Sequence, residues 1–116
     1  MEDSKDLMVS EALERLDGDK EFFAEIVGEF LSDYPRSLAE IEAAAVSGNY
    51  ESLNHAAHSM KSALANLGAM SASGFCFELE KIGRFKQEIT RAPALVGELR
   101  SAVARFESLF KQLMAE

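Results

Sequence analysis

Apolar residues recur at helical spacing along most of the chain, and this periodicity constrains the fold more than any other feature. Each residue of an α-helix advances by about 100°, so residues three or four apart share a face. One apolar stripe lies between residues 20 and 47, and another follows Pro93. Their members are Phe22, Phe23, Ile26, Val27, Phe30, Leu31, Tyr34, Leu38, Ile41 and Ala45, and then Leu95, Leu99, Val103, Phe106, Phe110 and Leu113. No segment shows the alternating, β-branched pattern of a strand, so the chain is predicted to be all-α.

Glycine, proline and capping residues mark where the predicted helices begin and end. Asp19 is placed to cap the N-terminus of a helix over residues 20–47, and Gly48 is typical of the residue that ends one. Pro35 lacks a backbone N–H and crowds the preceding turn. We therefore expect a kink or a short break near Tyr34.

Three more helices are predicted after this one. The first covers residues 54–69 and carries both histidines of the chain, and the second begins near Ser71 or Ser73. A polar connection over residues 85–93 leads to the last helix, which has Pro93 in its first turn.

A shorter amphipathic segment, Leu7–Leu16, precedes these helices. Helices joined by short connections pack as antiparallel neighbours. We predict an antiparallel four-helix bundle with a short N-terminal capping helix, in a single domain that spans residues 1–116.

Charge and composition exclude several classes of partner. The formal net charge is −8, and the 12 Lys and Arg residues are scattered among 20 Asp and Glu residues. No basic patch is visible, so we expect neither nucleic acid nor anionic membrane as a partner. Cys76 is the only cysteine, which excludes an internal disulfide and fits a reducing compartment. With no apolar run of membrane-spanning length and a polar N-terminus, we expect a cytoplasmic monomer.

The helix with the two histidines turns His58 away from its apolar face. Counted from Met60 at about 100° per residue, His58 lies about 160° away, with Ser62 and Ala65 beside it. Lys61 lies at about 100°, on the border of the apolar face, where its stem can cover apolar surface. The apolar face itself comprises Leu53, Ala56, Ala57, Met60, Ala63, Leu64 and Leu67. His58 is therefore predicted to be exposed, among small neighbours.

Three interpretations of this exposed face compete. The simplest is a solvated histidine without a function. The second is a divalent-metal site made by Glu51, His55 and His58, which lacks a fourth ligand and has the repelling cation Lys61 nearby. The third is a nucleophilic imidazole, because an exposed histidine is largely neutral near pH 7 and keeps a free lone pair. A cation at Lys61 would then stabilise a transferred anionic group.

The segment "AAHSMKSALANLGA" resembles the signature of the histidine-containing phosphotransfer (HPt) domain, A-H-x-L-K-G-S/A-x-x-x-x-G-A. The matching residues are Ala57, His58, Lys61, Ala63, Leu67, Gly68 and Ala69. Met60 replaces the usual leucine, and Ser62 stands where glycine is usual. The resemblance covers roughly Leu13 to Arg84 and includes "GNYE" before the motif and "CFELEKIGR" after it.

This resemblance implies a phosphorelay intermediate that takes a phosphoryl group from one receiver-domain aspartate and gives it to another. By the same resemblance, His58 is the phosphoacceptor and Lys61 holds phosphoryl oxygens. We expect partner contacts at Asn54, Ser62 and Ala65. The domain would have no cofactor of its own, and the receiver would supply Mg²⁺. No Walker loop is present, so no ATP-dependent kinase activity is expected.

Two other functions stay open from the sequence. A non-catalytic helical adaptor could present the same face to a partner. The dimerisation helices of a histidine kinase also carry a phosphorylatable histidine, but the four predicted helices disfavour that class.

Residues outside the motif are interpreted structurally. The phenylalanines at 22, 23, 30, 75, 77, 106 and 110 are predicted to be core, and Cys76 a buried small residue. The acidic residues Glu40, Glu42, Glu78, Glu80 and Glu88 are predicted to be solvated surface.

Overall fold

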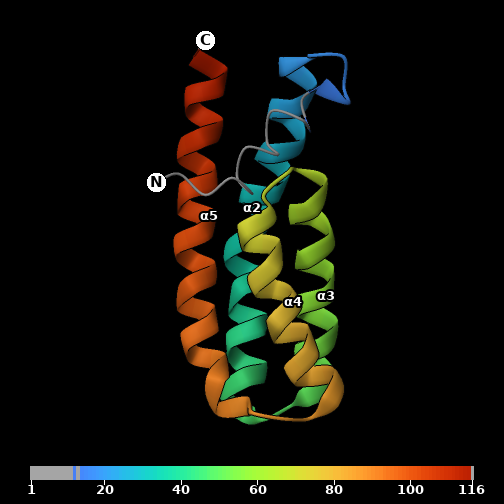
Figure 1. Cartoon of the computed structure of the whole chain (residues 1–116), viewed down its shortest axis with the longest axis vertical. Helices are drawn as coiled ribbons and strands as arrows, with labels where there is room; N and C mark the ends of the chain where they lie inside the picture. Colours follow the sequence, from blue (N-terminus) through green and yellow to red (C-terminus); the bar gives the residue numbers. More distant parts are fainter. Residues whose placement is uncertain (1–11, 13, 116) are drawn as a thin grey trace.

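Four long helices make up the computed structural model of the protein, which describes residue 12 and residues 14–115. They are α2 (Lys20–Ser47), α3 (Tyr50–Asn66), α4 (Met70–Phe85) and α5 (Ala92–Ala115), with a 3₁₀ turn, η2 (Ile89–Arg91), before α5. Successive helices run in opposite directions and lie side by side (Figure 1). The predicted antiparallel four-helix bundle is confirmed. The predicted capping helix, Leu7–Leu16, falls mostly outside the described residues.

Side-chain caps set the helix starts that position the site. The Asp19 carboxylate accepts the Phe22 N–H at 3.0 Å, as its N-cap position predicts. Gly48 adopts a left-handed conformation with φ 70° and ends α2. The Asn49 side chain then accepts the Ser52 N–H at 3.0 Å. Because Asn49 caps α3, this helix begins at Tyr50, earlier than the sequence predicts.

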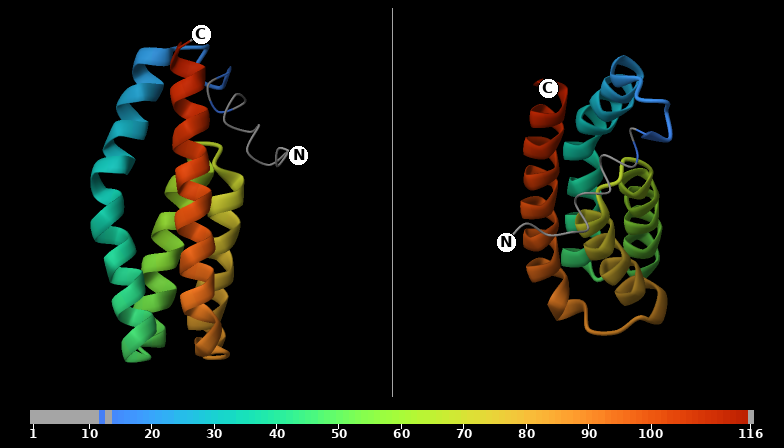
Figure 2. Two further views of the ribbon diagram at one scale, coloured as in Figure 1. Left: turned by 90° about the vertical axis from the view of Figure 1, so that its left-hand side faces the viewer. Right: turned by 45° about the horizontal axis from the view of Figure 1, so that its top comes forward.

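Pro35 lies inside α2 without interrupting it. The helix is continuous from Lys20 to Ser47, and its axis bows along its length in Figure 2. A bend is the expected response to a missing N–H and a crowded preceding turn. The alternative of a short break near Tyr34 is therefore wrong.

The core contains apolar side chains from all four helices, with Phe23 and Phe106 fully buried. Phe22 and Phe77 are exposed, so the prediction that every phenylalanine is core is wrong for these two. Adjacent helix residues point about 100° apart, and here Phe23 faces the core while Phe22 faces outward. Phe30, Phe75 and Phe110 are partly buried against the core. Within the described residues, no helix is both long enough and apolar enough to cross a membrane.

Cys76 is buried in the core, as predicted. Burial, with a smaller contribution from the negative charge of Glu80, raises the pKa of the Cys76 thiol to about 12. The thiol therefore stays protonated at neutral pH and packs as a small apolar group.

Helices α3 and α4 approach each other closely at Gly83. A Cβ atom on Gly83 would lie 2.5 Å from the Asn54 backbone nitrogen and 2.6 Å from the Tyr50 carbonyl oxygen. Both atoms belong to the backbone of α3, so they cannot move aside as a flexible side chain could. The missing side chain of Gly83 thus sets the distance between the two helices.

We expect Gly83→Ala to lower the free energy of unfolding by about 2–3 kcal/mol, because the added methyl forces the two backbones apart. Gly74→Ala on the same helix is the matched control, since a Cβ there meets nothing within 4 Å. That control should gain about 0.5–1 kcal/mol through helix propensity. Urea denaturation followed by circular dichroism measures both. Equal stability changes in the two variants would contradict a close approach at Gly83.

Candidate functional site

His58 projects from the outer face of α3, where its side chain is 59% exposed. Ser62, one turn later, is also exposed, while Ala65 is half-buried. Asn54 is half-buried where α3 crosses Gly83. The outward orientation predicted for His58 is confirmed, and its neighbours on α3 at Ser62 and Ala65 have short side chains.

A buried carboxylate lies directly beneath His58. Glu80, on α4, has a side chain that is only 8% exposed, and its Oε2 atom lies 3.1 Å from Nδ1 of His58. Its Oε1 atom lies 2.6 Å from the ammonium of Lys61. The prediction that Glu80 is solvated surface is wrong. Glu80 faces α3 because it lies three residues before Gly83 on the same face of α4, where the helices approach closely.

The contact with Glu80 determines which nitrogen of His58 carries a proton. An ionised carboxylate can only accept hydrogen bonds, so Nδ1–H of His58 donates to Oε2 of Glu80. In the neutral imidazole, the lone pair then resides on Nε2. The site therefore offers one unprotonated ring nitrogen on an exposed side chain.

Opposing influences act on the ionisation of Glu80. Burial raises the pKa of its carboxyl, but hydrogen bonds and charges from Lys61 and His58 lower it by more, so the net pKa lies below its ordinary value. Glu80 is consequently ionised at neutral pH. Both of its oxygens are committed, one to the histidine and the other to the lysine.

Lys61 occupies the border position that the helical geometry predicts, with its side chain 25% exposed. Its ammonium lies between the Glu80 carboxylate and the ring of Phe77, whose centroid is 5.0 Å away. The Ser73 hydroxyl donates to the Lys61 carbonyl at 3.1 Å and ties the first turns of α4 to α3. Lys61 and His58 thus share one carboxylate from the neighbouring helix.

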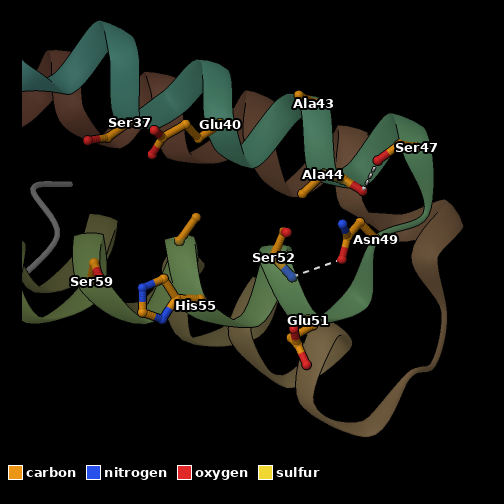
Figure 3. A pocket seen from close by; sticks show the side chains of 11 residues that line it. Ser37, Glu40, Ala43, Ala44, Ser47, Asn49, Glu51, Ser52, His55 and Ser59 are labelled. Carbon is orange, nitrogen blue, oxygen red and sulfur yellow. Dashed lines mark hydrogen bonds between the residues drawn. The ribbon is translucent and has the colours of Figure 1, made fainter.

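The metal interpretation of this face gains no support from the arrangement. Among residue 12 and residues 14–115, no three His, Cys, Asp or Glu side chains are grouped to hold a metal ion. Glu51 and His55 line a separate groove of about 820 Å³ between α2 and α3, to which His58 does not contribute (Figure 3). The other groove residues are Ser37, Glu40, Ala43, Ala44, Ser47, Asn49, Ser52, Ala56 and Ser59.

The fold and the site together define a class of protein: a helical bundle with an exposed histidine, His58, whose ring is held by a buried carboxylate. The family model of the Hpt domain matches residues 25–109, and the chain belongs to this family. This membership supports a role in phosphotransfer relays in general.

A solved structure agrees with this assignment. The chain is similar to histidine-containing phosphotransfer protein B (HptB) from Pseudomonas aeruginosa PAO1, with 32% sequence identity and a TM-score of 0.75. The match covers 90% of this chain and 88% of that one. The comparison with curated proteins gave no match.

We expect Glu80→Gln to lower the free energy of unfolding by about 1–3 kcal/mol near neutral pH, because the Lys61 ammonium loses its counter-charge. Folding lowers the pKa of Glu80, so its stabilisation is present above the ordinary carboxyl pKa and is lost as the pH falls through the lower folded value. The gap between the wild type and the variant should therefore shrink on acidification. Urea titrations between about pH 7 and about pH 3 measure it. A gap that stays constant over this range would argue against the ion pair.

Proposed function

We propose that the protein is a phosphorelay intermediate in which Nε2 of His58 accepts a phosphoryl group from a receiver-domain aspartate and passes it to another. The observation that carries this proposal is the anchoring of Nδ1 by the buried Glu80 carboxylate, at 3.1 Å. This contact assigns the lone pair to Nε2 and holds the ring in one orientation.

The transfer step follows from this protonation state. The Nε2 lone pair attacks phosphorus, the bond between phosphorus and the aspartyl oxygen breaks, and the aspartate leaves as a carboxylate. The phosphorylated ring retains its Nδ1 proton and carries positive charge, which the adjacent Glu80 carboxylate stabilises. Attack by an aspartate of a second receiver reverses the step and restores the neutral imidazole.

Lys61 supplies a positive charge beside the reacting group. Its ammonium shares Glu80 with His58, so it is held within the same cluster before any phosphoryl group arrives. A charge already in place stabilises phosphoryl oxygens without a reorganisation cost. The role we propose for Lys61 is this charge stabilisation.

The metal for the transfer is proposed to come from the receiver. Phosphoryl transfer uses Mg²⁺ to neutralise oxygen charge. Both oxygens of Glu80 are engaged by Lys61 and His58, so this carboxylate is a poor ligand for an added cation. The chain itself supplies the nucleophile, a counter-charge and a lysine.

Receiver domains are the proposed partners, in keeping with the family to which the chain belongs. A receiver must bring its aspartyl phosphate within bonding distance of Nε2. The short, exposed side chain of Ser62 lies one turn from His58 and leaves room for such an approach.

We expect His58→Gln to abolish phosphoryl acceptance while the bundle persists, because the exposed ring can be replaced without opening a cavity. Its stability should change by no more than about 1 kcal/mol, since the glutamine amide can still donate to Glu80. Radiolabel transfer from a phosphorylated receiver measures acceptance. His55→Gln is the matched control and should label normally. An unlabelled wild type across a panel of receivers would favour the non-catalytic adaptor.

We expect Ser62→Arg to block transfer from a phosphorylated receiver but to leave labelling by phosphoramidate intact. The long side chain obstructs a docked protein, whereas phosphoramidate is small and needs no docking surface. Ser62→Ala, which keeps the position short, should behave as the wild type with both donors. Equal losses with both donors would show that the arginine disturbs His58 itself, and full receiver transfer would show that this position is not in the docking surface.

A further inference from the structure

Phe77 is a large apolar side chain that remains exposed beside the site. Phe77 is 43% exposed, although it lies on α4 only three residues before the buried Glu80. Two ammonium groups lie over its ring, Lys61 at 5.0 Å and Lys81 at 4.7 Å from the centroid. These distances are within the range of cation–π attraction.

The two lysines differ in how else they are held. Lys81 pairs with Glu78 at 3.0 Å on the same helix, outside the His58 cluster, and Glu78 also pairs with Arg91 at 3.7 Å. Lys61 shares its carboxylate, Glu80, with His58. When the ring of His58 becomes positively charged, Glu80 pairs with two cations that repel each other. The net attraction that holds the Lys61 ammonium in place then weakens.

An aromatic ring can retain an ammonium without neutralising it. The face of the ring carries partial negative charge, which attracts a cation. The phenylalanine side chain as a whole is neutral and accepts no proton from the ammonium. A second carboxylate in the same place would hold Lys61 more strongly but would cancel the charge that the phosphoryl oxygens need. The Phe77 ring provides attraction and keeps the full positive charge available.

We propose that Phe77 is a positioning residue, whose ring keeps the Lys61 ammonium beside His58 while Glu80 balances the charge of the phosphorylated imidazole. The proposal rests on the proposed function of His58 and Lys61. It assigns a reason for an exposed phenylalanine that the core does not require.

Phe85 offers a matched control on the same helix. It is 58% exposed, and a cation, the Arg84 guanidinium, lies over its ring at 6.0 Å. Phe85 ends α4, two turns beyond Phe77 and away from Lys61. It therefore shares the exposure and the cation–π contact of Phe77 but not the proximity to the site.

The test measures labelling of His58 by phosphoramidate, whose P–N bond breaks with loss of ammonia as Nε2 is phosphorylated. This small donor removes docking from the measurement. Phe77→Leu should slow labelling roughly two- to five-fold, the scale of a solvent-exposed cation–π contact. Phe77→Tyr, which keeps the ring, should restore the rate, and Phe85→Leu should have no effect. Lys61→Ala should slow labelling roughly ten-fold, and adding Phe77→Leu to it should cause no further loss.

A second readout does not depend on phosphotransfer. The ε-methylene protons of Lys61 should show an upfield ring-current shift in the NMR spectrum of the wild type and of Phe77→Tyr, which Phe77→Leu removes. An unchanged labelling rate in Phe77→Leu, or a full additional loss in the Lys61→Ala background, would overturn the proposal. A missing ring-current shift would overturn it as well. Failure of phosphoramidate to label wild-type His58 would instead contradict the proposed function, and the NMR measurement would still decide whether Phe77 holds Lys61.

Discussion

The buried carboxylate of Glu80 is the group on which the site depends, because it reaches His58 and Lys61 at once. Both partners lie on α3 and Glu80 lies on α4, so the cluster exists only while these helices are in close contact. Gly83 permits that contact, since any side chain there would meet the backbone of α3. Gly83, which has no functional side chain, therefore allows the carboxylate of Glu80 to reach His58.

A buried charge is costly unless it is paired, and this site uses the pairing for orientation. The lowered pKa of Glu80 shows that the hydrogen bonds and charges of Lys61 and His58 outweigh the cost of burial. Ion pairs of this kind often add little to net stability compared with apolar packing. The cluster instead fixes the geometry of the site. His58 has one tautomer, and the ammonium of Lys61 has one location.

The apolar core of the bundle and the exposed face of α3 have different roles. The apolar faces of the helices supply rigidity, with side chains such as Phe23 and Phe106 fully enclosed. The ring of His58, which we propose to be the phosphoacceptor, lies on the opposite side of α3 and is exposed. The site contributes His58, Glu80 and Lys61, and we infer that a receiver supplies the aspartate and the Mg²⁺ for the transfer. In the function that we propose, the bundle contributes by preorganising His58 and its nearest charges.

Residues within one helix were predictable from the sequence, and contacts between helices were not. Periodicity and caps predicted the bundle, the outward orientation of His58 and the border position of Lys61, because these depend only on the regular geometry of a single helix. The burial of Glu80 was not predicted. Acidic residues are usually solvent-exposed, and only the packing of α3 against α4 buries this one. Phe77 was predicted to be core because it is a large apolar residue, and it is exposed. Only the crossing of α3 and α4 decides which side chains of two separate helices meet, because that crossing depends on how the whole core packs.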